Sequence, residues 1–254
     1  MPSLSAAIIT LNEAAHIERV LRSLSCADEI VVVDSGSTDA TCAIAERLGA
    51  RVVQHRFEGF AAQKNFAISL ARFDWVLSLD ADEELDATAQ AALAKWKMCE
   101  PSAAGYYFAR RAFYLGRWIL HSGWYPDYKL RLFHRNLGVW RGDYVHESVV
   151  VEGEEQKLEG EILHYTCDSL EDHRRRIEFY TDKAAQEMLA RGEKAGWLKR
   201  LAAPPWIFIN TYFFRLGILD GHQGFLLAWM AARYVARKYA KLQYLHHKTA
   251  TQPA

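Results

Sequence analysis

Two carboxylates stand two residues apart where a predicted strand ends. Asp80 and Asp82 flank one alanine and follow the apolar run Trp75–Leu79. Carboxylates at this spacing can share one hard cation, and a divalent ion held by few carboxylates keeps positions free for phosphate oxygens. Asp34 ends an earlier strand-like run and adds a third such carboxylate. The pattern predicts a nucleotide-diphosphate site; the alternative is that Asp82 and the acids after it open the next helix.

Polar residues near the other predicted strand ends extend this candidate site. A carboxylate such as Asp34 can accept the N3–H of uracil, a donor that cytosine lacks. Ser37 suits a helix start, where its hydroxyl would cap backbone N–H groups. Lys64 and Asn65 offer a cation and an amide that can reach phosphate or sugar oxygens, although both also suit a solvated helix face.

Strand and helix periods alternate over roughly the first hundred residues and would position these side chains. Strands are predicted at 4–10, 29–34, 51–55 and 75–79, and helices at 14–24, 38–48, 61–71 and 86–96. This alternation predicts an α/β fold with a mostly parallel, Rossmann-like central sheet, helices on both faces, and ligands at the carboxyl ends of the strands. Aromatic and β-branched residues over 105–166 favour a mixed or antiparallel extension of that sheet.

The last third of the chain has helical periodicity and a basic character. Helices are predicted at 169–191, 206–219 and 225–242. Ser169 and Asp172 form a capping box for the first, and Pro204-Pro205 stand before the second. The whole chain has zero net charge, but the stretch from Lys194 to the end holds nine Lys/Arg and one acid, Asp220. A tail this basic predicts an anionic partner.

Four segments in order carry a family resemblance. They are Thr10-Leu-Asn-Glu13, Val31–Asp39, Gln63-Lys-Asn65 and Leu79-Asp-Ala-Asp82. Each is weak alone, but their combination and spacing resemble the inverting family 2 glycosyltransferases of the GT-A fold. The resemblance implies a GT-A nucleotide-sugar transferase domain over 1–168, followed by a helical, membrane-associating region over 169–254.

The resemblance also implies roles for individual residues. Asp34 would bind the uracil of a UDP-sugar donor, with Thr10 and Glu13 lining the base pocket. Asp82 would be the firmest ligand of Mg²⁺ or Mn²⁺, and Asp80 would lie near the ribose or the metal. His164, which could instead be structural, would be a further metal ligand. The full nucleotide-sugar set would be Thr10, Asn12, Glu13, Asp34, Ser37, Lys64, Asn65, Asp80 and Arg131, the last of which could equally be an edge-strand charge.

Inversion at an anomeric carbon needs a carboxylate that deprotonates the acceptor hydroxyl. The family often carries a Glu-Asp pair for this purpose, whereas this chain has Tyr144-Val-His-Glu147 followed by Ser148. Glu147 is therefore the candidate base, with His146 to orient it or to bind acceptor and Asp143 as the next candidate. The alternative for Glu147 is a surface residue at a strand start.

The whole-chain layout resembles a bacterial subgroup that builds the lipopolysaccharide core. The matching parts are the segment 144–147, the His164-Tyr165 step, the helix after it, and the glycines and Asp220 of 217–224. The implied reaction is transfer of glucose from UDP-glucose to an inner-core heptose, a lipid-linked saccharide acceptor. Apolar bulk over 206–230, flanked by Arg233, Arg237, Lys238 and Lys241, predicts a helix lying on an anionic membrane surface. The same faces could instead pack on a second subunit.

Missing patterns exclude other classes. The first strand–helix turn lacks the G-x-G-x-x-G of dehydrogenases, and no P-loop is present. Four cysteines without a C-x-x-C pair fit reduced thiols, and no run of apolar residues is long enough to span a bilayer. We expect a cytoplasmic protein, peripheral at the inner face of the cytoplasmic membrane, without a nucleic-acid partner. Two alternatives stay open: another UDP-sugar transferase, such as a UDP-N-acetylhexosamine enzyme with another cell-envelope acceptor, and a membrane-docked nucleotide-sugar-binding protein.

Overall fold

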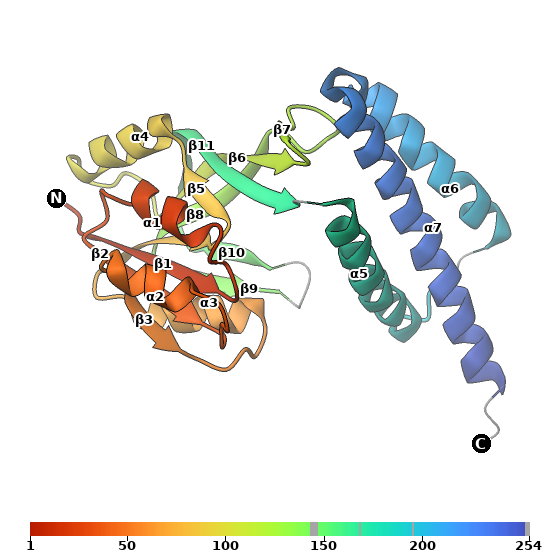
Figure 1. The fold of residues 1–254 in the computed structure, drawn as a ribbon, viewed down its shortest axis with the longest axis horizontal. Helices are drawn as coiled ribbons and strands as arrows, with labels where there is room; N and C mark the ends of the chain where they lie inside the picture. Colours follow the sequence, from red (N-terminus) through yellow and green to blue (C-terminus); the bar gives the residue numbers. More distant parts are fainter. Residues whose placement is uncertain (143–146, 168, 195, 252–254) are drawn as a thin grey trace. The chain divides into compact units, whose positions relative to one another are not determined.

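The structure is a computed structural model that describes residues 1–142, 147–167, 169–194 and 196–251 (Figure 1). The chain forms two compact units. The first comprises Met1–Arg111 with Asp127–Tyr165, and the second comprises Ala112–Pro126 with Thr166–Ala254. The helical unit thus also takes in a segment from the middle of the chain, which a single boundary at 168 does not include. Asp143, His146 and the rest of 143–146 lie outside the described residues.

The first unit is built on a mixed sheet in the strand order β3-β2-β1-β4-β8-β6-β11-β5. Its strands are β1 (Leu4–Thr10), β2 (Glu29–Asp34), β3 (Arg51–Gln54), β4 (Trp75–Asp80), β5 (Glu83–Leu85), β6 (Gly105–Tyr114), β8 (Asp127–His134) and β11 (Glu155–Cys167). The strands β1 to β4 pair in parallel, and β8 joins β4 antiparallel. Two short strands, β9 (Gly138–Arg141) and β10 (Ser148–Val151), form a separate ribbon, and β7 (Arg117–Trp118) pairs with β6. The predicted α/β class and the antiparallel extension are confirmed.

Helices cover both faces of the parallel strands, as Figure 1 shows. They are α1 (Ile17–Ser23), α2 (Thr41–Arg47), α3 (Phe60–Ser69) and α4 (Ala87–Lys97). Every residue of β1 is buried because its alternate side chains enter two different cores. Leu4 and Ile8 pack with the α1 and α4 side, and Ile9 packs with the α3 side. The sheet therefore holds the carboxyl ends of β1, β2 and β4 side by side.

The helix start predicted at 38 is wrong, whereas the start predicted at Asp86 is confirmed to within one residue. Residues 38–40 do not belong to α2, and neither Ser37 nor Thr38 caps it, because Ser37 bonds to the loops around it instead. The alternative to the diphosphate site, in which Asp82 and the acids after it open the next helix, does not hold for Asp82, Glu83 or Glu84. Glu83 begins β5, which pairs antiparallel with β11, and only Asp86 serves as the N-cap of α4.

The second unit contains mainly helices. They are α5 (Leu170–Ala190), α6 (Trp197–Ile209), the π-helix η1 (Asn210–Phe214), the 3₁₀-helix η2 (Gly217–Asp220) and α7 (Gly221–Thr251). Ser169 caps α5 as predicted, since its hydroxyl accepts the N–H of Asp172 at 3.0 Å. Pro204 and Pro205 lie inside α6, so the helix predicted to begin after them is wrong. Each proline removes one backbone donor, and α6 continues alongside α7 despite that loss (Figure 1).

Two of the four basic residues predicted to face a membrane pair within the unit instead. Arg237 Nε lies 2.8 Å from Glu178 Oε1. Lys241 Nζ lies 3.0 Å from Glu178 Oε2 and 2.8 Å from Asp182 Oδ1. These charges fasten α7 to α5. Within the described part of the chain, the helices are either too short or too polar to cross a bilayer.

Candidate active site

Asp34 lies at the carboxyl end of β2 and is fully buried. Its carboxylate accepts the backbone N–H of Gly36 at 2.8 Å and of Ser37 at 2.7 Å, and the Ser37 hydroxyl donates to it as well. Gly36 has φ +99°, which glycine adopts without strain. Burial alone would raise the pKa of Asp34, but these hydrogen bonds outweigh burial and hold the pKa below its ordinary value. Its role toward uracil stays a prediction.

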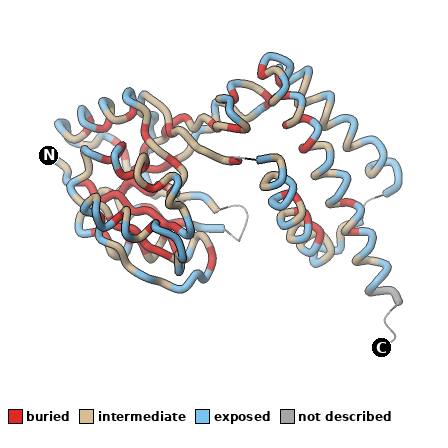
Figure 2. Tube along the Cα trace, in the orientation of Figure 1, coloured by how far each residue is buried: buried red, intermediate tan, exposed pale blue. Residues whose placement is uncertain are grey.

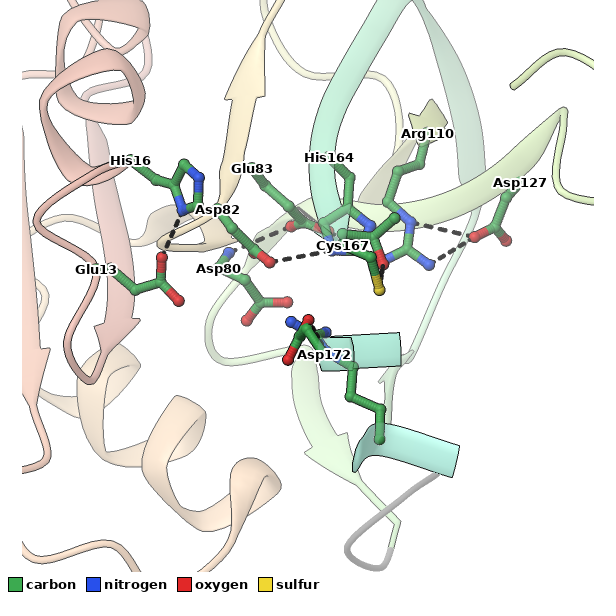
Figure 3. A network of polar contacts seen from close by, with 12 residues as sticks. Glu13, His16, Asp80, Asp82, Glu83, Arg110, Asp127, His164, Cys167 and Asp172 are labelled. Atoms are coloured by element: carbon green, nitrogen blue, oxygen red, sulfur yellow. Dashed lines mark hydrogen bonds and ion pairs between the residues drawn. The ribbon is translucent and has the colours of Figure 1, made fainter. Parts of the chain in front are cut away.

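The loop after β1 is tied to the loop after β2. The N–H of Asn12 donates to Ser37 Oγ at 2.8 Å, and Asn12 Oδ1 accepts the N–H of Thr38 at 2.8 Å. Asn12 and Ser37 therefore shape the site by holding two loops together. Glu13 directs its carboxylate to His16 Nδ1 at 2.7 Å (Figure 3). The buried hydroxyl of Thr10 has no hydrogen-bond partner within the described residues.

Lys64 contacts two other predicted site residues, Asp80 and Glu147. It projects from α3, is 3% exposed, and its Nζ lies 2.9 Å from Asp80 Oδ1 and 3.4 Å from Glu147 Oε1. The same ammonium lies 4.2 Å from the ring centroid of Trp140. The ammonium of Lys64 therefore contacts both the candidate base Glu147 and the Asp80 carboxylate at the end of β4. Trp140, from β9, was not anticipated as a neighbour of the site.

Glu83 is the main site residue that sequence reasoning missed. It is fully buried, and its Oε1 lies 2.8 Å from Arg131 and 3.1 Å from Arg110. Its Oε2 accepts the N–H of Asp80 at 3.2 Å (Figure 3). Burial acts to raise the pKa of Glu83, but the guanidinium groups of Arg131 and Arg110 outweigh burial and hold the pKa far below its usual range. Arg110 in turn pairs with Asp127 at 2.7 Å.

Two predicted donor-binding residues, Asn65 and Arg131, have partners within the protein, and their roles toward a donor stay predictions. The Nδ2 of Asn65 donates to the carbonyl of Trp140 at 2.9 Å, and its Oδ1 accepts the N–H of Trp140 at 3.0 Å. Arg131 is buried and lies between Glu83 and Asp80, 3.4 Å from Asp80 Oδ2. Arg131 therefore braces the Asp80 carboxylate, and Asn65 positions β9.

Asp82 and His164 form the part of the site that fits a metal ion. Asp82 Oδ2 lies 3.2 Å from His164 Nε2 (Figure 3), and the N–H of Tyr165 donates to the carbonyl of Asp82 at 3.0 Å. A carboxylate oxygen and an imidazole nitrogen suit Mn²⁺ better than Mg²⁺. Asp80, the other predicted ligand, is instead engaged by two cations, Lys64 and Arg131. In the described ranges no three His, Cys, Asp or Glu side chains are grouped for a metal. An ion on this pair would take its remaining ligands from a bound diphosphate or water.

Known proteins match this chain over most of its length. The family model of glycosyl transferase family 2 matches residues 5–147. The lipopolysaccharide core biosynthesis glycosyltransferase LpsC of Rhizobium meliloti is 31% identical over 98% of this chain and 95% of its own. An uncharacterized glycosyltransferase of Rickettsia felis is 32% identical over 96% of this chain and 90% of its own. The solved mannosyltransferase PcManGT of Pyrobaculum calidifontis, in complex with GDP-Man and Mn²⁺, has a similar fold: its TM-score is 0.54 at 16% identity, covering 96% of this chain and 87% of that one.

Proposed function

Because this chain belongs to glycosyltransferase family 2, we propose that it is a metal-dependent inverting hexosyltransferase that moves glucose from UDP-glucose to an inner-core heptose of lipopolysaccharide. The observation that carries the proposed chemistry is the meeting of Lys64, Asp80 and Glu147 at the carboxyl end of the parallel strands. The relative LpsC, which is named for lipopolysaccharide core biosynthesis and matches nearly the whole chain, supports the acceptor class.

The donor side of the proposed site is divided between fixed loops and charged groups. Asp34 and Thr10 bind the uracil, and Asn12 and Ser37 hold the two loops that frame it. Lys64 binds the donor diphosphate from its position beside Asp80. These contacts fix the nucleotide and leave the sugar exposed to an acceptor.

Asp82 and His164 hold a divalent ion, Mn²⁺ or Mg²⁺, in this proposal. The ion, when bound, neutralises the charge that develops on the leaving diphosphate. Asp80 turns toward Lys64 and Arg131 and reaches the ion only if those ion pairs rearrange. The mannosyltransferase of similar fold, which was solved with GDP-Man and Mn²⁺, is compatible with this use of a metal.

Glu147 is the proposed general base. The acceptor hydroxyl oxygen forms a bond to the anomeric carbon as the bond from that carbon to the diphosphate oxygen breaks. The bonding pair leaves with UDP, and the hydroxyl proton passes to the Glu147 carboxylate. The ion pair with Lys64 positions that carboxylate within the site. Inversion requires it to act on the acceptor hydroxyl from the face of the sugar opposite the leaving diphosphate.

The acceptor proposed here is lipid-linked, which places the enzyme at the cytoplasmic face of the membrane. In this proposal the exposed, positively charged side chain of Arg233 on α7 contacts anionic lipid of that membrane. An enzyme that uses UDP-N-acetylhexosamine, and a protein that only binds nucleotide sugars, are the competing functions.

A donor and acceptor screen tests the proposal. The purified protein is incubated with radiolabelled UDP-glucose, UDP-galactose or UDP-N-acetylglucosamine, with Mn²⁺, Mg²⁺ or chelator. The acceptors are lipopolysaccharides truncated just outside the inner-core heptose and, as the matched control, lipopolysaccharides that lack heptose. We expect glucose transfer only to the heptose-bearing acceptor and only with metal. Transfer of N-acetylglucosamine instead would overturn the donor assignment, and nucleotide binding without transfer or hydrolysis would overturn the enzymatic one.

A further inference from the structure

The second unit exposes large apolar side chains where α6 runs through η1 and η2 into α7. Six of them are between 49% and 69% exposed, namely Trp206, Phe213, Phe214, Leu216, Ile218 and Leu219, which we call the apolar face. Soluble proteins rarely leave so many neighbouring large apolar groups in water, and such patches mark interaction sites. Figure 2 shows the same stretch as largely exposed tube.

Ring contacts make the apolar face continuous. The ring of Trp206 lies 5.9 Å from that of Phe214. Phe213 contacts Tyr212 at 5.1 Å, and Tyr212 contacts Phe225 on α7 at 5.8 Å. The aromatic groups of η1 therefore join the end of α6 to the start of α7.

The backbone that carries the apolar face is held in place by buried contacts. The exposed side chains therefore do not belong to a loose loop. Asp220 is 2% exposed, and its carboxylate accepts the N–H groups of Leu120 and His121, each at 3.1 Å. Gly224 packs so closely on Gly217 that a Cβ at Gly224 would lie 1.8 Å from the Gly217 carbonyl oxygen. These contacts fix η2 against α7 and leave its apolar side chains outward. The glycines and Asp220 of 217–224 thereby gain a structural role.

Charge around the apolar face selects its partner. The stretch from Lys194 onward has nine Lys/Arg and one acid, and that acid, Asp220, is buried. Arg215 lies within the apolar face and is exposed. Arg117, also exposed, donates to the carbonyl of Leu219 at 3.2 Å. An aromatic surface with two arginines beside it matches the boundary between anionic headgroups and acyl chains. A second protein copy would instead bring its own basic surface against this one.

We propose that the apolar face inserts into the headgroup boundary of an anionic bilayer, with Arg215 at the level of the lipid phosphates. The proposal rests on the lipid-linked acceptor of the proposed function. Insertion of apolar groups supplies most of the binding, because Arg237 and Lys241 are already paired with α5. High salt therefore weakens the association without abolishing it, since 1 M salt screens charges beyond about 3 Å but leaves apolar contacts.

Vesicle sedimentation of the full chain tests this mode of binding. The vesicles contain phosphatidylethanolamine and phosphatidylglycerol, with and without high salt. The double variant Phe213→Ser/Phe214→Ser removes two aromatic groups from the apolar face, and Phe179→Ser on α5 removes a phenylalanine that is 52% exposed, as Phe213 is. We expect the double variant to bind at least about tenfold more weakly and Phe179→Ser to bind as the parent does. Far-ultraviolet circular dichroism verifies that all three fold.

Two outcomes would overturn the proposal. One is equal sedimentation of the parent and the double variant. The other is a stable lipid-free dimer that dissociates in the double variant, which would assign the apolar face to a second copy. Transfer to a water-soluble heptose acceptor separates the two hypotheses. Retained transfer without vesicle binding refutes only the docking, and vesicle binding without transfer refutes only the proposed function.

Discussion

Replacing Glu83 with glutamine should destabilise the first unit more than any surface charge change. The variant keeps the side-chain shape but leaves the buried guanidinium of Arg131 with Asp80 alone, and Arg110 with Asp127 alone. Breaking a buried ion pair from one side costs about 3–5 kcal/mol. Because both arginines keep one acidic partner, we expect the lower end, a loss of about 3 kcal/mol in the free energy of unfolding.

The loss should depend on pH in a defined direction. The folded-state pKa of Glu83 is lowered, so its stabilisation is full above the unfolded pKa of about 4.3 and declines as pH falls toward the folded value. The difference in the free energy of unfolding between the parent and Glu83→Gln should therefore not change with pH above about pH 5. Below about pH 4.3 it should shrink by up to about 1.4 kcal/mol per pH unit.

Urea unfolding followed by circular dichroism at several pH values measures both effects. Asp74→Asn is the matched control, because Asp74 pairs with Arg135 at 3.2 Å but is 56% exposed. A pair that exposed should change stability by about 1 kcal/mol or less. The reasoning is refuted if Glu83→Gln loses no more than Asp74→Asn, or if the difference from the parent does not shrink in acid.

Further predictions concern the metal pair and the second unit. Asp82→Ala should abolish transfer and the Mn²⁺-dependent part of UDP binding in calorimetry, because the pair with His164 is lost; full activity of this variant in chelator would contradict it. Asp220→Asn should lower the stability of the second unit by about 2 kcal/mol, because an amide has one accepting oxygen for the donors that the carboxylate now serves. Hydrogen exchange around Leu120 to Ser122 should rise while UDP affinity stays constant, and unchanged exchange would count against that role.

The sequence predicted those elements whose signal is repeated over many residues. The apolar run Ile30–Val33 predicted a parallel strand buried on both faces, and the run Ala6–Ile9 predicted a second strand. Both lie in central parallel strands. Ser169 was readable as a cap because its position before a long helix leaves few other roles. The position of Pro204 and Pro205 inside α6 could not be predicted from the sequence. The packing of α6 on α7, which offsets the lost backbone hydrogen bonds, involves residues remote in sequence.

The candidate site was predicted by residue type but not by side-chain direction. Lys64, Asp80 and Glu147 were named from three separate segments, and the structure brings their charged groups together. Asn65 adjoins Lys64 in sequence yet turns to the backbone of β9, since neighbouring helical residues point to different sides. Glu83 escaped notice because a strand as short as β5 has no periodicity to read.

The role of Glu147 is tested most directly by Glu147→Gln in a single-turnover transfer assay. The variant keeps the shape of the side chain but cannot accept the proton from the acceptor hydroxyl. We expect the transfer rate to fall by about 10²-fold or more, with UDP-glucose affinity nearly unchanged because the donor contacts lie on other residues. A near-normal transfer rate in this variant would contradict the assignment and move the base to another carboxylate, with Asp143 the next candidate.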